Sequence, residues 1–389
     1  MMPNLKRILA KLPNKPAYAT DFGAMYEGDS LEHLRTLPSG TVDLVVTSPP
    51  FALVRKKQYG NESAAEYVAW FSSFADEVHR VLKSTGSFVI DIGGSWLPGL
   101  PVRSTYQYQL VIELTRPGRF HLAQDFFWHS PSKLPSPAEW VTVRKIRVKD
   151  AVNTVWWLSK TPYPKASNDR TSVEYSEAML SLLRNGYTAK KRPSGHDISK
   201  NFGRDRGGAI PSNLLVISHT TSNDYYQRRC REEQIAVHPA RFPIDLPLFF
   251  ISMLTDPGDL VVDIFGGSNV TGWACEHTQR NWLSFELDSA YVAGSKFRFE
   301  KGCPVPDADC VGSRDATPVR PIRIRSDPAK LGTGETRVNG NVAKNGADRA
   351  VAAQGAVQSL LAERLSVEIC RSRGRNKARP AIAAQGGLF

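Results

Sequence analysis

Two stretches of alternating strand-like and helical patterns constrain the fold of this chain most strongly. In the first, Val42–Thr47 is a short apolar run that reads as a buried strand. Residues 65–83 then carry apolar side chains at helical spacing, and Ser87–Ile92 is a second strand-like run. A strand–helix–strand succession of this kind predicts parallel strands joined by a crossover helix.

The same rhythm returns nearer the C-terminus, after a long region rich in Pro, Ser, Lys, Arg and aromatic residues. The elements expected there are a helix at 246–255, a strand at Leu260–Phe265, a helix near 270–279, a strand at Trp282–Glu286 and a helix at about 288–300. The chain is therefore predicted to have an α/β fold, with one largely parallel sheet covered by helices on both faces.

A ligand site is predicted where the strand Leu260–Phe265 ends. Asp263 is followed by a Gly-rich turn, and ligands of open α/β sheets bind beyond the carboxyl ends of the strands. Glu286 ends the next strand, where an acid can accept hydrogen bonds from ribose hydroxyls. The G-x-G-x-x-G spacing and a Walker A lysine are absent, and Asp263 suits a ligand with an amino-acid ammonium group. S-adenosylmethionine carries both that ammonium and an adenosine, although an ordinary turn in which Asp263 caps a helix is the alternative.

The residues expected to contact the cofactor cluster around this turn. They are Asp29, Asp263, Phe265, Gly266, Gly267, Ser268, Asn269 and Glu286. Asp29 precedes a helix that starts near Leu31, so it contacts the adenine amino group or serves as a plain N-cap.

A second site is predicted where the strand Val42–Thr47 runs into Ser48, Pro49, Pro50 and Phe51. Two prolines hold the backbone extended, so that their carbonyls point rigidly. An exocyclic amine is a poor nucleophile because its lone pair is conjugated with the ring. Acceptors on both of its hydrogens, the Ser48 hydroxyl and the Pro49 carbonyl, favour a pyramidal nitrogen whose lone pair attacks a sulfonium methyl group. Phe51 offers a face for a flipped base.

Asp91 ends the strand Ser87–Ile92 and is expected to orient the target amine or receive its proton, or else to cap the following turn. The catalytic candidates are thus Ser48, Pro49, Pro50, Phe51 and Asp91. Cytosine C5 methylation requires an attacking thiol, usually preceded by Pro, and no Pro-Cys dipeptide occurs. A simple proline-rich turn is the alternative.

The charge of the chain favours a polyanionic partner. Lys and Arg total 50 against 38 Asp and Glu, a formal net charge of +12. Basic side chains that would contact DNA are Arg55, Lys56, Lys57, Lys133, Arg144, Lys145, Arg147 and Lys149. A strand would place Lys145, Arg147 and Lys149 on one face, where they would follow phosphates. Solvated surface is the alternative for each cluster.

Six stretches in one order now identify a resemblance. They are Thr47–Lys57, Pro131–Trp140, Arg144–Lys160, Arg192–Asp197, His238–Pro243 and Leu260–Asn269. Together they resemble the β group of amino-DNA methyltransferases, whose sequence is circularly permuted, over roughly residues 20–300. The Gly turn departs from the family, since it reads Ser268-Asn269-Val270-Thr271 where most relatives have Ser-Gly-Thr-Thr.

The resemblance implies a circularly permuted, Rossmann-like, S-adenosylmethionine-dependent methyltransferase that acts on duplex DNA. Ser before Pro-Pro favours cytosine N4 over adenine N6, so the expected role is modification in a type II restriction–modification system, with CAGCTG as a suggested site. The expected parts are a catalytic half at 20–95, a target-recognition region at 96–235, a cofactor-binding half at 236–301 and a basic, largely disordered tail at 302–389. An adenine N6 enzyme of the same fold, or a non-catalytic nucleic-acid-binding protein, are the alternatives.

Several further expectations concern the binding partners of the protein and its location in the cell. Five Cys without a C-x-x-C pair fit a reducing compartment, and no apolar run is long enough for a membrane span. No metal is expected, and His238 is expected to be structural, because methyl transfer to an amine needs neither a metal nor a general acid. We expect a bacterial or archaeal cytoplasmic protein associated with the nucleoid. It would act alongside a cognate restriction endonuclease without a stable complex.

Overall fold

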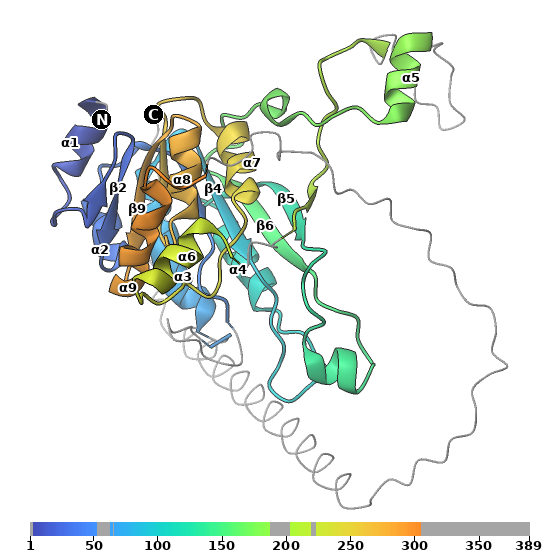
Figure 1. Cartoon of the computed structure of the whole chain (residues 1–389), viewed down its shortest axis with the longest axis horizontal. Helices are drawn as coiled ribbons and strands as arrows, with labels where there is room; N and C mark the ends of the chain where they lie inside the picture. Colours follow the sequence, from blue (N-terminus) through green and yellow to red (C-terminus); the bar gives the residue numbers. More distant parts are fainter. Residues whose placement is uncertain (1–2, 53–62, 65, 187–202, 219–222, 305–389) are drawn as a thin grey trace, which may run out of the picture. The chain divides into compact units, whose positions relative to one another are not determined.

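The computed structural model describes residues 3–52, 63–64, 66–186, 203–218 and 223–304 (Figure 1). Arg55, Lys56 and Lys57 lie outside the described residues, as does the tail from residue 305 onward. The roles predicted for them therefore stay predictions. The elements below all belong to one unit of the chain, Met1–Val319.

A single mixed sheet of nine strands organises the described residues. The strands are β1 (Tyr18–Ala19), β2 (Gly23–Glu27), β3 (Val42–Thr47), β4 (Leu82–Ile92), β5 (His121–His129), β6 (Val152–Ser159), β7 (Leu214–Val216), β8 (Leu260–Asp263) and β9 (Asn281–Glu286). Their order across the sheet is β1-β2-β9-β8-β3-β4-β6-β5-β7. The neighbours from β2 to β4 are parallel, whereas β6 is antiparallel to both β4 and β5.

Helices connect the strands and cover the sheet. They are α1 (Pro3–Leu9), α2 (Ser30–Thr36), α3 (Tyr67–Val81), α4 (Tyr106–Leu114), α5 (Glu177–Asn185), α6 (Tyr225–Glu232), α7 (Asp245–Leu254), α8 (Val270–His277) and α9 (Ser289–Ser295). Shorter turns of helix occur at Glu139–Val143 (π), Asn168–Thr171 (3₁₀) and Lys296–Phe299 (3₁₀).

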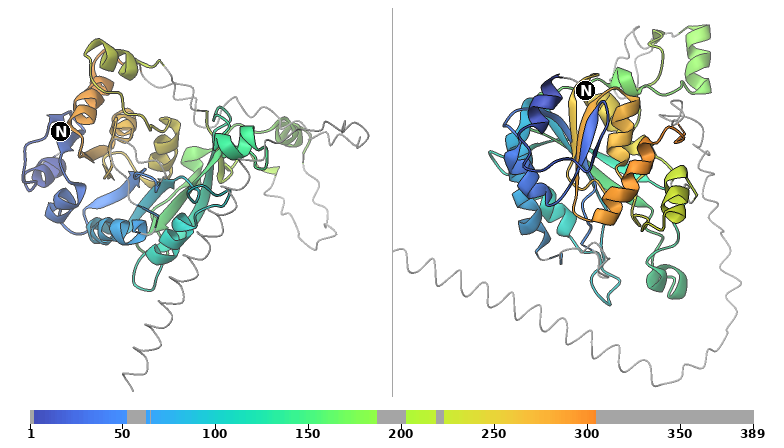
Figure 2. Two further views of the ribbon diagram at one scale, coloured as in Figure 1. Left: turned by 90° about the horizontal axis from the view of Figure 1, so that it is seen from below. Right: turned by 60° about the vertical axis from the view of Figure 1, so that its left-hand side comes forward.

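Two hydrophobic clusters place α1–α4 and α7–α9 on opposite faces of the sheet (Figure 2), whereas α5 and α6 belong to neither cluster. One cluster joins the sheet to α1–α4 and includes Leu34, Phe71 and Leu110. The other joins the sheet to α7–α9 and includes Phe250 and Val292. Burial of apolar surface on both faces explains why the central strands β3 and β8 are buried at every position.

The α/β fold predicted from the two periodic stretches is confirmed, with shifts at element ends. Strand β4 starts at Leu82, directly after α3, and β8 ends at Asp263 rather than Phe265. The expected helix at 288–300 is α9 followed by the 3₁₀ turn Lys296–Phe299. The observed ends differ from the predicted ones because helix capping and the last helical turn depend on tertiary contacts, and a periodic sequence pattern does not reveal those contacts.

The region between the two stretches also builds the sheet. Strands β5, β6 and β7 and helix α4 all lie within residues 96–235. Trp156 and Trp157 are buried on β6, where Trp156 pairs with Ile90 and Trp157 with Val89. The range assigned to target recognition therefore also supplies one flank of the methyltransferase sheet.

Residues 145–149 do not form the strand that would place Lys145, Arg147 and Lys149 on one face. These residues follow the π turn Glu139–Val143 and belong to no strand. Lys145 has a φ of +55°, in the left-handed region, and the Ile146 and Arg147 amides both donate to the Trp140 carbonyl. The backbone folds back on the π turn, and its amides are used locally instead of in a ladder.

Candidate functional site

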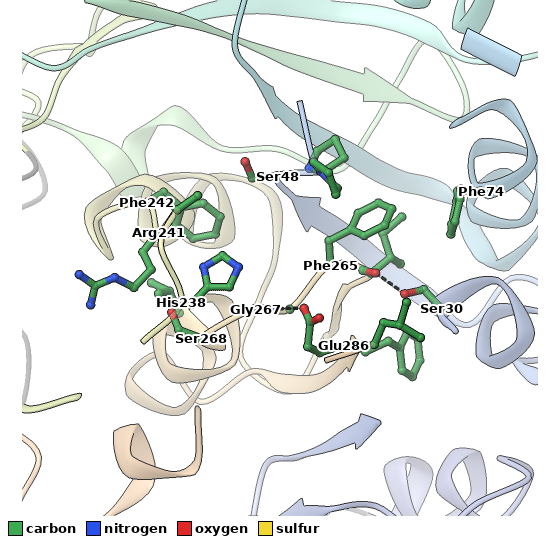
Figure 3. Close-up of a pocket in the computed structure, with 18 of the residues that line it drawn as sticks. Ser30, Ser48, Phe74, His238, Arg241, Phe242, Phe265, Gly267, Ser268 and Glu286 are labelled. Atoms are coloured by element: carbon green, nitrogen blue, oxygen red, sulfur yellow. Dashed lines mark hydrogen bonds between the residues drawn. The ribbon is translucent and has the colours of Figure 1, made fainter. Parts of the chain in front are cut away.

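The carboxyl edge of the parallel strands opens into a cavity of about 360 Å³ (Figure 3). Its lining comes from the segments that follow β2, β3, β8 and β9, from α3, and from the segment before α7. Figure 3 shows His238, Arg241 and Phe242 on one side and Ser30 and Phe74 on the other. A cavity of this size at this edge is the usual ligand site of an open α/β sheet.

Ser48, Pro49, Pro50 and Phe51 line this cavity, as the sequence predicted for a common site. They leave β3 at its carboxyl end, so the strand sets where they lie. Gly93 makes room for Phe51, because a Cβ at Gly93 would lie 2.5 Å from the Phe51 ring. The aromatic face beside Ser48 thus depends on a glycine at the end of β4.

Asp91 lies behind Ser48 and does not itself line the cavity. The Ser48 hydroxyl donates to Asp91 Oδ2 at 3.0 Å, and Asn153 Nδ2 donates to Asp91 Oδ1 at 3.1 Å. Burial raises the pKa of Asp91 to about 6, against the lowering effect of these two hydrogen bonds and of nearby Lys133. Asp91 thus reaches the cavity through Ser48, and it does not cap the turn after β4.

Glu286 and the Gly turn form the part of the cavity expected to hold the cofactor. Glu286 accepts from the Gly267 amide at 2.8 Å through one oxygen and from the Asp288 amide at 2.9 Å through the other. Each carboxylate oxygen has a second lone pair that these bonds leave for a ligand hydroxyl. Phe265, Gly266, Gly267 and Ser268 line the same cavity. Gly267 has a φ of +51°, and a Cβ there would approach the His238 ring to 3.1 Å.

The cofactor roles predicted for Asp263 and Asn269 have no counterpart in the cavity lining. Asp263 is buried and accepts from the Thr47 and Thr271 hydroxyls at 2.8 and 2.6 Å, and also from the Phe265 amide. Burial raises the pKa of its carboxyl group. The carboxyl group joins β3, β8 and α8, so the structure places it beneath the cavity as a support.

Asn269 explains the departure from the family's usual Ser-Gly-Thr-Thr turn. It adopts left-handed dihedrals, φ 55° and ψ 45°, and its side chain caps α8 at the Gly272 amide. Gly is the residue most at ease in that conformation, and Asn is the next most tolerant. The same side chain accepts from Ser284 and donates to Tyr18.

Asp29 lies in the cavity lining and also caps α2 by accepting from the Leu31 amide at 2.7 Å. The two readings that the sequence left open are therefore compatible. One oxygen caps the helix, and the residue still borders the ligand space.

Several lining residues were not predicted as site residues. Trp70 and Phe74 come from α3, and Arg241 and Phe242 precede α7. His238, expected to be structural, lines the cavity as well and packs edge-on against Tyr291. The stretch His238–Pro243 is one of those that carry the family resemblance, and that resemblance is the sequence signal that could have identified His238, Arg241 and Phe242 as site residues.

The basic side chains predicted to contact DNA form a network around the π turn. Arg144 pairs with Glu139 and stacks on Trp140, and Arg147 donates to the Pro101 carbonyl. Lys149 donates to the Pro131 and Lys133 carbonyls. These side chains and Lys145 remain exposed, so contact with phosphates stays a prediction for them.

Lys133 differs from the other four, because its ammonium group turns toward the catalytic residues. Lys133 is exposed as a residue, yet its Nζ lies 3.2 Å from Asn153 Oδ1, and Asn153 is buried. Partial burial lowers the pKa of Lys133, against the effect of the nearby carboxylates Asp150 and Asp91.

Among the residues that the structure describes, no three His, Cys, Asp or Glu side chains are grouped so that they could share a metal ion. None of the helices described is long and apolar enough to span a bilayer.

Comparison with known proteins agrees with this geometry. A family model described as DNA methylase matches residues 42–297. The type II methyltransferase M.PvuII of Proteus hauseri is 56% identical over 288 residues, which are 73% of this chain and 86% of that protein. M.ScaI of Streptomyces caespitosus is 26% identical over 288 residues, covering 73% and 83% of the two chains. The solved structure of the PvuII DNA methyltransferase (cytosine-N4-specific) superposes with a TM-score of 0.61 and 49% identity, covering 75% of this chain and 91% of that one.

The sheet, its permuted order and its cavity define an S-adenosylmethionine-dependent methyltransferase. The chain belongs to the DNA methylase family, and DNA is its substrate.

Proposed function

We propose that this enzyme transfers a methyl group from S-adenosylmethionine to N4 of cytosine in duplex DNA. The observation that carries the proposal is the placement of Ser48 in one cavity with Glu286 and the Gly turn. The identity of 56% to M.PvuII, together with the structural likeness to the cytosine-N4-specific PvuII enzyme, points to the same target atom.

The lining fits the adenosine part of the donor. Glu286 offers acceptor lone pairs for ribose hydroxyls, and the aromatic side chains Phe74, Phe265 and Phe285 offer apolar surface for a purine. Arg241 also borders the cavity, but its guanidinium is directed away from it (Figure 3), where it pairs with Asp224 at 3.4 Å and lies over the Tyr226 ring. S-adenosylmethionine supplies, when bound, a methyl group on a positively charged sulfur.

The residues after β3 prepare the target nitrogen. The Ser48 hydroxyl donates its hydrogen bond to Asp91, so the lone pairs of its oxygen are left to accept from the amine. The Pro49 carbonyl is the second predicted acceptor, and Phe51 the surface against which the base stacks. Two acceptors on the amine hydrogens draw the nitrogen lone pair out of conjugation. Because N4 is paired inside the duplex, the base must leave the helix to reach this cavity.

The setting of the reaction is part of the proposal. We infer that the enzyme is the modification partner of a type II restriction endonuclease, acts without a stable complex with it, and works on chromosomal DNA in a prokaryotic cytoplasm. The site CAGCTG, suggested by the family resemblance, belongs to the same proposal. The exposed basic side chains around the π turn are the proposed contacts to the DNA backbone.

Product analysis tests the proposal directly. DNA treated with the enzyme and isotope-labelled S-adenosylmethionine is digested to nucleosides and analysed by chromatography with mass spectrometry. N4-methylcytosine is the expected product, and retention time separates it from its isomer methylated at C5. Detection of N6-methyladenine instead would show that adenine, and not cytosine, is the target base. No labelled nucleoside on DNA that contains CAGCTG and other sequences would contradict the proposed activity.

A further inference from the structure

A chain of hydrogen bonds runs from the surface to Ser48 across β6 and β4. Lys133 Nζ is 3.2 Å from Asn153 Oδ1, Asn153 Nδ2 is 3.1 Å from Asp91 Oδ1, and Asp91 Oδ2 is 3.0 Å from the Ser48 hydroxyl. Asn153 on β6 and Asp91 on β4 are both buried, and the two strands pair through Asp91 and Val155.

The chemistry of these groups fixes which group donates and which accepts in each hydrogen bond of this series. An ammonium group only donates, so the Asn153 carbonyl oxygen must face Lys133 and its amide N–H must face Asp91. A carboxylate only accepts, so Ser48 must donate to Asp91. The lone pairs of the Ser48 oxygen then face the cavity, where a target amine brings hydrogens that need acceptors. A reversed chain would present the Ser48 proton to those hydrogens and repel the amine.

We propose that Asn153 and Lys133 are positioning residues that keep Asp91 an ionised acceptor and thereby keep Ser48 an acceptor toward the target amine. The inference rests on the proposed amino methylation. It also separates Lys133 from the other exposed basic side chains around it, since its ammonium acts on the catalytic residues rather than on a phosphate.

Among the charged groups around Asp91, Lys133 is the one whose charge lowers the pKa of the Asp91 carboxyl group. The Arg103–Asp150 ion pair acts on Lys133 with charges of opposite sign, and the hydroxyl of Tyr106 on α4, which lies near Asp91, donates to the Gly93 carbonyl. Burial favours the neutral form of Asp91, while Asn153, Ser48 and Lys133 favour the carboxylate. Loss of the Lys133 charge therefore raises the pKa of Asp91.

The pH dependence of turnover tests whether loss of the Lys133 charge raises the pKa of Asp91. If activity needs the Asp91 carboxylate, kcat/KM of the wild-type enzyme rises with pH through the pKa of Asp91, about 6. In Lys133→Gln the rise moves to higher pH, since the charge that favours the carboxylate is gone. Lys133→Arg keeps the charge and is expected to restore the wild-type position. Lys145→Gln, at an exposed lysine of the same segment, changes DNA affinity at most and leaves the rise in place.

A second variant is independent of the surface residue. Asn153→Asp keeps the shape of the side chain but sets another carboxyl group beside Asp91, and it is expected to move the rise in the same direction. Thermal unfolding and cofactor binding establish that each variant is folded. An unmoved rise in both Lys133→Gln and Asn153→Asp, with only KM for DNA increased in Lys133→Gln, would overturn the inference and make Lys133 a phosphate contact.

Infrared difference spectroscopy gives a readout that needs no catalysis. The carboxyl band of Asp91, identified by its loss in Asp91→Asn, is followed against pH in the wild-type enzyme and in Lys133→Gln. A shift of the band's titration to higher pH supports the inference even if no methylated DNA is found. A methylating enzyme with an unshifted band refutes it while leaving the proposed function intact.

Discussion

Ser48 is the residue whose hydroxyl the proposed chemistry depends on most directly. In Ser48→Ala the acceptor toward the amine is lost, while the backbone of Pro49 and Pro50 and the face of Phe51 are kept. We expect DNA binding near the wild-type value and turnover lowered at least tenfold, an effect of the size usual for one lost transition-state hydrogen bond. Single-turnover methylation together with a DNA-binding titration measures both. Unchanged turnover would remove the role given to Ser48.

Glu286 is the residue expected to decide cofactor affinity. Glu286→Ala removes the acceptors for the ribose hydroxyls and also the anchor of the Gly267 amide. We expect the dissociation constant of S-adenosylmethionine, measured by calorimetric titration, to rise by about tenfold or more.

Asp288→Ala is the matched control for Glu286. Asp288 caps α9 through the Ala290 and Tyr291 amides, and loss of such a cap costs about 1 kcal/mol of stability. Its dissociation constant for the cofactor is expected to stay near that of the wild type. Equal constants for Glu286→Ala and the wild type would refute the ribose assignment.

Gly93 shows how a residue outside the cavity lining shapes it. Because a Cβ there would stand 2.5 Å from the Phe51 ring, Gly93→Ala must displace that ring. We expect turnover to fall at least tenfold with cofactor affinity near the wild-type value, since the Gly turn is untouched. Parallel measurements of turnover and of cofactor binding check this. Full activity would mean that the base does not stack on Phe51.

At the scale of elements, the sequence predicted those that are buried on a regular period. Helix α3 and the strands β3, β8 and β9 follow from such periods. Residues 145–149 also alternate basic and apolar side chains, yet Ile146 and Val148 are exposed and form no strand. An alternating pattern predicts a strand only where one face is buried, and burial is a tertiary property.

The cavity was predicted in part for a similar physical reason. Ser48, Phe51, Gly266 and Glu286 follow strand ends, and strand ends of a parallel sheet meet at one edge. Trp70, Phe74 and Arg241 come from a helix face and a loop whose positions depend on packing. Asp263 was predicted at the right edge, but its hydrogen bonds to Thr47 and Thr271 turn it inward. Only three-dimensional contacts distinguish a ligand-facing carboxylate from a supporting one.

The stability of α3 is expected to depend on its buried aromatic side chains. Phe71 is fully buried, stacks near Phe88 of β4, and lies close to Phe265 behind the cavity. Phe71→Ala is expected to cost about 3–5 kcal/mol, because it removes a large apolar side chain and leaves a void. Denaturant unfolding measures the loss. A cost below about 1 kcal/mol would mean that the surrounding residues collapse into the space.

At the scale of the whole molecule, the family match and the cavity lie within the first three hundred residues. The family model ends at residue 297, and the cavity-lining residues run from Asp29 to Leu287. Residues 302–389 hold 14 Lys and Arg against 8 Asp and Glu.

A variant that ends at Pro304 is therefore expected to keep methylation at its site, with weaker non-specific DNA binding at low salt because positive charge is lost. Methylation assays and binding titrations over a range of salt concentrations compare it with the full chain. Loss of site-specific methylation in a truncated variant that still binds S-adenosylmethionine would assign the tail a role in the reaction.

The order of strands has a consequence for how a cell makes this enzyme. Among the strands that the structure describes, β8 and β9 are synthesised last, yet they lie in the middle of the sheet, between β3 and β2. A nascent chain that has emerged from the ribosome only as far as β7 therefore lacks the two strands that join β2 to β3. Ser48 follows β3 and Asp29 follows β2, so the two sides of the cavity are not yet connected through the sheet. Modification of the genome can start only when translation of that central pair is complete, so unfinished chains released early carry no partial activity.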